Sequence, residues 1–468
     1  MKNGIGHKKV QITREKLFCP ENLFLLIGYV FGFLLIYSNP PFQSNDEDRH
    51  FYNAYLLSTG QITPVQNKNQ VGGYLPKNLY AVSDMYQGIP FSTGAKINYK
   101  MLKELSAVPL NKEAQEFYDN SSYRINPVSY FPFIIGIKAA ALINSNPIHL
   151  LWGARIAGLL TFLLIVFFAI KIIPVHKWVL FAVALSPMTI YQATSVSYDV
   201  LCLSLSFLII ALALKYAFME SKLRAGDIAL YCLAVLLQSS TKSGYFLVPL
   251  FFLVVPLKNI GSVKRLMVAV TCIVAACFLP SLLWNSYLSS LHLGCGKPVI
   301  NDFLYGTAEQ TKVILSAPFA FVSNLFLNSI VQGKDWIIGA LGRFGYAYAK
   351  MNHTVLFFHG LALIVISVLD SSKTLVFSCL QKVVTAIAAI GTIVIIIAGF
   401  LFISPVGANM IFGLQGRYFI PILPLLLLLN INQKEWVPMA EKWKAPAIAL
   451  YVTVVLAYTI RFINARFY

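Results

Sequence analysis

Long apolar runs alternate with short polar segments along most of the chain, a pattern that indicates helices crossing a membrane. A helix needs about 20 apolar residues to cross the hydrocarbon core of a bilayer, and several of these runs are shorter. The pattern predicts about eleven membrane-spanning helices, at residues 22–39, 150–170, 178–194, 199–216, 227–238, 243–257, 265–284, 353–369, 383–403, 417–431 and 445–463.

Two long segments separate these runs, at residues 40–149 and 285–352. The first contains another apolar stretch, "NPVSYFPFIIGIKAAALI" at residues 126–143, which Pro127 and Pro132 interrupt. Counting this stretch as a span would reverse the side on which every later loop lies. It is therefore expected to be an interfacial or re-entrant helix within the first long segment.

Lysine and arginine in the short loops give the orientation, because cytoplasmic loops are enriched in both. The loops on the side of the N-terminus contain basic clusters such as Lys215, Lys222 and Arg224. Short loops on the other side contain few basic residues, among them Lys242 and Arg417. The N-terminus is thus predicted to be cytoplasmic, and residues 40–149 and 285–352 are predicted to form external loops.

Composition supports the same class of protein. Hydrophobic residues make up 57% of the 468 residues and charged residues only 12%, whereas soluble domains have about 25% charged residues. We therefore expect one all-α polytopic domain over residues 1–468. The net charge of +18 reflects the cytoplasmic loops and does not indicate nucleic-acid binding. No P-loop or GxGxxG motif is present, which argues against an ATP-driven pump.

The first external loop begins with an acidic cluster, "SNDEDRH", directly after the first apolar run. One interpretation is purely structural: Ser44 and Glu47 fit a capping box, and Asp46 and Asp48 suit the positive end of a helix dipole. That interpretation does not explain His50, which lies one helical turn from Asp46. Both interpretations, helix start and active site, remain open from this stretch alone.

The functional interpretation is a catalytic carboxylate at the membrane surface. A carboxylate such as Asp46 or Glu47 can take the proton of a hydroxyl nucleophile as general base. Asp48 or His50 can orient that base. A divalent cation, Mg²⁺ or Mn²⁺, held by Asp46 and Glu47 is a further possibility.

Other polar residues begin or connect the predicted spans. Asp199 is either a residue of a capped first turn or a second acid of the site. Lys242 and Arg417 either anchor the chain at the membrane surface or bind a phosphate, with Tyr418 beside Arg417. Arg155 either extends to the surface or contacts substrate. Arg124 and Tyr130 are candidates for lining an acceptor cleft.

Four stretches carry a resemblance to a known family: "SNDEDRHFYNAYLLSTGQI", and then "SVSYDVLCLSLSFLIIAL" (195–212), "TKSGYFLVPLFFL" (241–253) and "GLQGRYFIPILPLLLL" (413–428). Together they resemble an uncharacterised family of bacterial polytopic membrane proteins, whose first-loop pattern is roughly P-D-E-x-x-H-F-x-R-A-Y. This chain departs from it at Asn45, where Pro is usual, and at Asn53, where Arg is common. The added Asp48 leaves open which acid is the base.

That family is similar to glycosyltransferases of the GT-C fold, which use sugars linked to polyprenyl phosphate. The resemblance implies a GT-C-like helix bundle with interfacial helices in the first external loop. It also implies an inverting hexosyltransferase of the bacterial inner membrane, with its active site on the outer face. The acceptor would be a surface glycan, either O-antigen or a wall polymer. Alternatives are a transporter or flippase of lipid-linked sugars, and a glycan polymerase or ligase.

Overall fold

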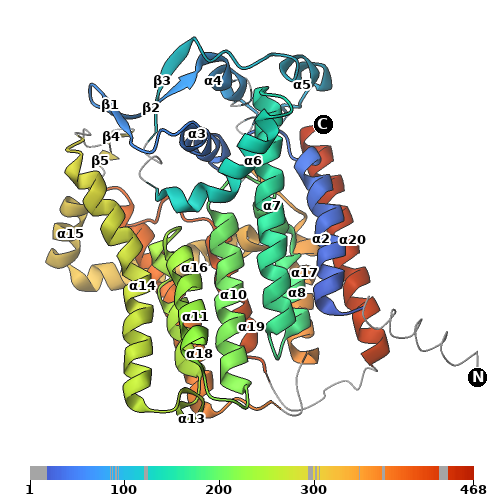
Figure 1. The fold of residues 1–468 in the computed structure, drawn as a ribbon, viewed down its shortest axis with the longest axis vertical. Helices are drawn as coiled ribbons and strands as arrows, with labels where there is room; N and C mark the ends of the chain where they lie inside the picture. The colour runs from blue at the N-terminus through green and yellow to red at the C-terminus, as the bar shows by residue number, and fades with distance from the viewer. Residues whose placement is uncertain are drawn as a thin grey trace, which may run out of the picture.

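The computed structural model describes residues 18–468, except 85, 87, 90, 91, 93, 121–124, 294–298, 301, 302, 305, 347, 371–374 and 432–440. Long helices run side by side along the longest axis of the molecule, and the segment between α2 and α7 covers one end of them (Figure 1). Arg124, expected in an acceptor cleft, lies outside the described residues.

Six helices among the described residues are long and apolar enough to cross a membrane. They are α2 (Pro20–Ser38), α7 (Pro147–Ile172), α10 (Asp199–Phe218), α14 (Val263–Ser290), α18 (Cys379–Ile403) and α20 (Glu441–Phe467). A seventh candidate is the pair α15 (Thr307–Ser316) and α16 (Pro318–Gly342), which meet at 105°. The chain is therefore an integral membrane protein of mostly helical fold, and the predicted count of eleven spans is not confirmed.

Several predicted spans are single short helices or sets of shorter pieces. The single helices are α11 (Ala225–Ser239) and α17 (His353–Leu369). The divided spans give α8 (Lys177–Ala184) and α9 (Pro187–Ala193); η3 (Ser243–Tyr245), α12 (Leu247–Leu250) and η4 (Phe251–Val254); and η5 (Gly416–Ile422) and α19 (Leu423–Leu428). Prolines at 187, 249, 421 and 424 lie in these pieces. Proline has no N–H for the helical hydrogen bond, so it limits the length of each piece.

The predicted first external loop contains strands as well as helices. Its helices before the apolar stretch are α3 (Glu47–Ser58), α4 (Lys77–Asp84) and α5 (Tyr99–Leu105). The strands β1 (Val65–Asn67), β2 (Gln70–Pro76) and β3 (Gln115–Asp119) form an antiparallel sheet in that order, with Gly72 opposite Asp119. The sequence did not predict this sheet beside the helices of the loop.

The apolar stretch 126–143 forms η2 (Pro127–Tyr130) and α6 (Phe131–Ala141). Pro127 and Pro132 occupy the first turns of these helices, where a missing N–H costs nothing, so they start helices rather than interrupt one. α6 packs closely on α7, because a side chain at Gly136 would collide with the backbone of Gly153. Together η2 and α6 are shorter than a span.

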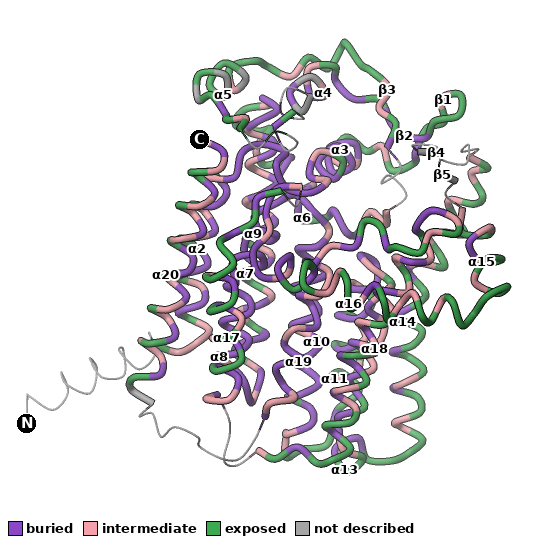
Figure 2. The backbone as a smooth tube through the Cα atoms, turned by 180° about the vertical axis from the view of Figure 1, so that it is seen from behind, coloured by how far each residue is buried: buried purple, intermediate pink, exposed green. Residues whose placement is uncertain are grey.

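The core of the molecule surrounds α10, as Figure 2 shows by the buried positions along it. In its most apolar window α10 is 83% buried, whereas α14 is only 28% buried. The predicted second external loop, 285–352, contains α15 and α16 together with short strand pairs, β4 (Val299–Ile300) with β5 (Phe303–Leu304) and β6 (Arg343–Phe344) with β7 (Ala349–Lys350).

Candidate functional site

Four charged side chains meet where the start of α3, the start of α10, the start of η5 and the turn after α11 come together. Lys242 Nζ lies 2.5 Å from Asp199 Oδ1. Arg417 bridges the two acids, with Nη1 3.3 Å from Asp199 Oδ2 and Nη2 3.4 Å from Asp46 Oδ2. The structure thus brings together four of the site residues predicted from sequence, which are widely separated along the chain.

Asp46 holds an unusual backbone conformation at the residue before α3. Its φ of 58° and ψ of 15° are left-handed, a region that non-glycine residues seldom occupy, although aspartate tolerates it. The Asp46 side chain is 44% exposed, while that of Arg417 is 4% exposed. Residues held in such conformations cluster at functional sites. Asp46 therefore presents a carboxylate to solvent beside a buried cation.

The expected capping box is absent from this helix start. The side chain of Asp46, which is the residue before the helix, makes no capping hydrogen bond. Ser44 instead accepts a hydrogen bond from Asn39 Nδ2 at 2.9 Å. Glu47 is the first residue of α3 rather than its third, and its carboxylate turns away from the helix backbone toward Arg155.

Glu47 and Arg155 form a fully buried ion pair, with both side chains 0% exposed. Arg155 donates from Nε to Oε1 at 2.8 Å and from Nη2 to Oε2 at 2.6 Å. The backbone N–H of Val196 donates to the same Oε1 at 3.0 Å. Arg155 also donates to the carbonyls of Ile36, Asn39 and Pro40.

This ion pair corrects two expectations from sequence. Arg155 neither extends to the membrane surface nor lies open to a substrate, because the end of α2, the start of α3 and α7 enclose its guanidinium. Glu47 was expected to be a possible base or metal ligand, but both of its oxygens accept hydrogen bonds from buried donors. The geometry therefore indicates that Glu47 anchors the loop that carries Asp46.

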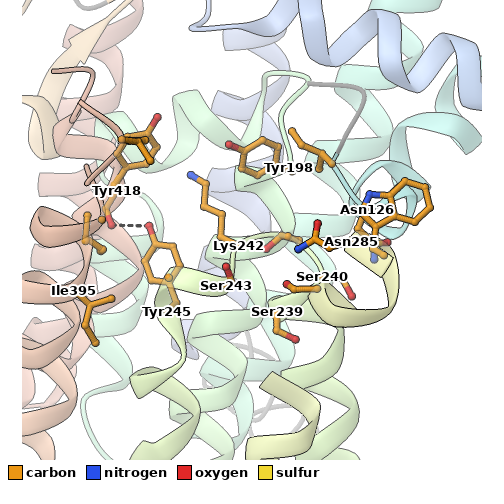
Figure 3. A pocket seen from close by; sticks show the side chains of 18 of the residues that line it. Asn126, Tyr198, Ser239, Ser240, Lys242, Ser243, Tyr245, Asn285, Ile395 and Tyr418 are labelled. Carbon is orange, nitrogen blue, oxygen red and sulfur yellow. Dashed lines mark hydrogen bonds between the residues drawn. The ribbon is translucent and has the colours of Figure 1, made fainter. Parts of the chain in front are cut away.

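Lys242 lies between two aromatic rings at the top of a pocket (Figure 3). Its Nζ is 4.0 Å from the ring centre of Tyr418 and 4.8 Å from that of Tyr198, distances at which a cation is attracted to the ring face. The Tyr245 hydroxyl donates to the backbone carbonyl of Tyr418 at 2.7 Å. Burial alone lowers the pKa of Lys242, but the Asp199 carboxylate and the neighbouring tyrosines together raise it more, so the net shift of the pKa is well upward and the ammonium stays charged.

Arg417 is positioned by the glycine that precedes it. A side chain at Gly416 would collide with the backbone of Trp336 and Gly339 in α16, so η5 and α16 touch through their backbones. The Arg417 guanidinium also donates to Gln192 Oε1 at 3.3 Å and to the Tyr418 hydroxyl at 3.4 Å. Only glycine allows this close approach of the two backbones, which explains the glycine before the arginine in "QGRY".

His50 belongs to a chain of hydrogen bonds that fixes the orientation of its ring. Asn120 Nδ2 donates to Asn53 Oδ1 at 2.7 Å, and Asn53 Nδ2 donates to the Tyr130 hydroxyl at 3.1 Å. The Tyr130 hydroxyl in turn lies 2.8 Å from His50 Nδ1, and the tautomer of His50 decides which of the two atoms donates.

Burial also keeps His50 neutral. It lowers the pKa of His50 to about 4, although the carboxylates of Asp46 and Asp199 act in the opposite direction. The ring packs edge-on against Tyr198, with centres 4.8 Å apart. Asp48 lies apart from this group: the Tyr346 hydroxyl donates to its Oδ1 at 3.1 Å, and burial raises its pKa.

Some residues of this site did not stand out in the sequence. Gln192, Tyr198, Asn53 and Asn120 contact the predicted residues through the bonds described above. Of these residues, only Gln192 has a recognisable sequence feature, because its polar amide lies inside an apolar run. Tyr130, which was expected to line an acceptor cleft, instead supports His50.

The pocket below Lys242 has a volume of about 490 Å³ and two kinds of lining. One side is polar, from the turn after α11. The other is apolar or aromatic, from α14 and α18, with Trp284, Ile395, Ile396, Phe400 and Ile403. Both helices are largely exposed on the outside of the bundle. The pocket therefore joins the partly buried Lys242 to the outside of the bundle.

The residues proposed from sequence as metal ligands do not fit a metal ion. Glu47 is occupied by Arg155, and the Asp46 carboxylate faces Arg417. Within the described part of the chain, no group of three or more His, Cys, Asp or Glu side chains could hold a metal. No step below is routed through a metal.

Comparison with known proteins gives a family but no close relative. No curated protein and no solved structure matches the chain. One family model, described as predicted membrane protein (DUF2142), matches residues 29–426, which include all the charged residues of the site. Because the match covers most of the sequence, the chain belongs to the DUF2142 family of membrane proteins.

Proposed function

We propose that the chain is an inverting membrane glycosyltransferase of GT-C type. It would transfer a sugar from a polyprenyl-phosphate donor to a hydroxyl of a surface glycan, O-antigen or wall polymer, on the outer face of the bacterial inner membrane. One observation carries the proposal: the partly buried Lys242 and the buried Arg417 lie between a partly apolar pocket and the exposed carboxylate of Asp46.

The donor phosphate suits the cationic end of the pocket. Arginine offers a planar pair of donors to phosphate, and the lysine ammonium adds a point charge. The wall from α14 and α18 suits the apolar chain of the donor. Charges that are fixed before the reaction stabilise a leaving phosphate without reorganisation. Tyr418 supports both cations, through its ring and its hydroxyl.

Asp46 is the acid best placed to act as base. Asp199 has one oxygen on Lys242 and the other on Arg417, and Glu47 is enclosed with Arg155. Asp46 retains access to solvent, with 44% of its side chain exposed. We therefore assign Glu47 to anchoring, Asp199 to holding the cations, and Asp46 to proton transfer.

The reaction follows from these roles. Asp46 accepts the proton of the acceptor hydroxyl, whose oxygen bonds to the anomeric carbon from the face opposite the donor phosphate. The bond from that carbon to the phosphate oxygen breaks, and its electron pair leaves with the polyprenyl phosphate. Lys242 and Arg417 stabilise the resulting negative charge. Neutral His50 is a positioning residue beside Asp46.

The alternatives fit these positions less well. A transporter or flippase places ionisable groups near the middle of the membrane. Asp199 and Arg417 instead lie in the first turns of α10 and η5, and Lys242 lies in a turn between helices. A polymerase or ligase is favoured by external loops rich in arginine and histidine, whereas residues 285–352 contain few of either.

The test is the mass of the surface glycan in cells that lack the gene and in cells complemented with the wild-type chain. Loss of one hexose per acceptor unit, restored by the wild-type chain, supports the transferase. Loss of all long glycan chains supports a polymerase or ligase. An unchanged glycan in both strains contradicts the proposal.

A further inference from the structure

A groove of about 780 Å³ runs along α16 and α17, away from the ion network. α17 contributes residues spaced by three or four positions, which form one face about 16 Å long: His353, Leu356, Phe357, Gly360, Leu361 and Ile364. α16 contributes Gly333, Lys334, Ile337 and Leu341 among others. The residues of α16 that contact η5, Trp336 and Gly339, are not among those that line the groove.

The groove is apolar and open to the outside of the bundle. Ile337 is 65% exposed and Phe357 is 67% exposed. Two glycines keep it hollow, since Gly333 has no neighbouring atom that an added Cβ would meet, and Gly360 faces only a leucine side chain. In a membrane protein such a surface contacts acyl chains. Its length of about 16 Å allows an acyl chain to lie along it.

One cation on the wall of this groove has no protein partner. Lys334 is exposed and forms no ion pair or hydrogen bond with any residue that the structure describes. Its helical neighbours Ile330, Val331 and Ile337 are all apolar and more than 60% exposed. An ammonium on an apolar, lipid-facing surface is unfavourable unless an anion pairs with it. His353, at the first turn of α17, lines the same groove and adds hydrogen-bonding capacity there.

We propose that this groove binds one anionic phospholipid of the surrounding bilayer. The lipid phosphate would pair with Lys334 and His353, and one acyl chain would follow α17 past Phe357 toward Ile364. This site is separate from the donor pocket and does not depend on the proposed glycosyl transfer. Because α16 contacts the backbone of η5, the lipid would support the helix that positions Arg417.

Native mass spectrometry of the full-length protein in detergent tests the proposal, with phosphatidylglycerol and phosphatidylcholine added in turn. The wild type should retain one phosphatidylglycerol in preference to phosphatidylcholine. Lys334→Ala should weaken phosphatidylglycerol binding about fivefold, while Lys312→Ala, a change to an exposed lysine of α15, should not. Gly333→Leu fills the groove where there is room for a side chain and should abolish retention. The matched change Gly226→Leu, also at an open helical glycine, should have no effect.

Three results would overturn the assignment. The first is equal retention of both lipids by the wild type, and the second is wild-type retention of phosphatidylglycerol by both groove variants. The third is displacement of phosphatidylglycerol by a lower concentration of polyprenyl phosphate, which would give the groove to a different lipid. Glycan transfer by the variants is measured separately, so loss of the lipid site and loss of the transferase are distinguishable.

Discussion

Replacing Glu47 by glutamine distinguishes the structural role that we assign to Glu47 from the catalytic role that we assign to Asp46. The change preserves size and still allows the side-chain carbonyl to accept the Val196 N–H. It removes the negative charge opposite Arg155, and it places an amide N–H₂ group where Arg155 now donates. The variant therefore leaves a buried guanidinium without its counter-charge.

The magnitude follows from the burial and the remaining partners. Removing one member of a fully buried ion pair typically costs about 3–5 kcal/mol of the free energy of unfolding. Arg155 keeps its bonds to the carbonyls of Ile36, Asn39 and Pro40, so we expect the lower end, about 3 kcal/mol. Asp46→Asn should cost at most about 1 kcal/mol, because the Asp46–Arg417 contact is half exposed on the acid side.

Unfolding of the purified protein in detergent, followed by tryptophan fluorescence, measures this difference. Glu47→Gln should unfold well before the wild type. The double variant Glu47→Gln with Arg155→Met should be less destabilised than the sum of the single variants, with a coupling energy of about 1 kcal/mol or more. If Glu47→Gln unfolds like the wild type but lacks transfer, Glu47 is the base and our assignment of the acids is wrong.

Four further predictions concern the site and its side of the membrane. Asp46→Asn should lower the rate of sugar transfer ~10²–10⁴-fold at normal protein level, and Arg417→Lys should also lose most transfer, because lysine lacks the planar fork; near-normal rates would contradict these roles. Because burial lowers the pKa of His50 to about 4 from its ordinary 6.5, the stability gained by keeping it neutral is complete above about pH 6.5 and is lost as the pH falls toward 4; a His50→Gln variant should show a smaller loss of unfolding free energy over that range. A cysteine at Asn67 should react with an impermeant reagent in intact cells, whereas one at Ser221 should not, and the reverse result would invert the topology.

The sequence predicted six of the long helices, because runs such as residues 199–216 are continuous and apolar, but it did not predict α16. The predicted count of spans is not confirmed where proline divides a run, as at Pro187 and Pro421, since composition alone does not give the direction of successive short helices. The sequence also missed the small sheet. β1 and β3 are short, with exposed polar residues in their pairing segments, so they carry little alternating pattern.

The residues of the ion network were predicted from their charge and their position at the ends of apolar runs, as for Asp199 and Lys242. Their mutual contacts were not, because pairing across many intervening residues leaves no local pattern. Glu47 shows the limit most clearly. Its spacing from Ser44 fits a capping box, but the buried Arg155 competes for the carboxylate and offers it stronger, charge-assisted hydrogen bonds.

The ion pair between Glu47 and Arg155 has a consequence for biogenesis. Arg155 lies inside α7, and an arginine entering a bilayer alone costs about 2.5–3.5 kcal/mol even on the most permissive scale. Its partner lies 108 residues earlier in the chain, so the ribosome completes α2 and the start of α3 before α7 emerges. We expect α7 to be released into lipid only when it can dock on that earlier segment. The charge of Arg155 would then set the order in which these helices assemble.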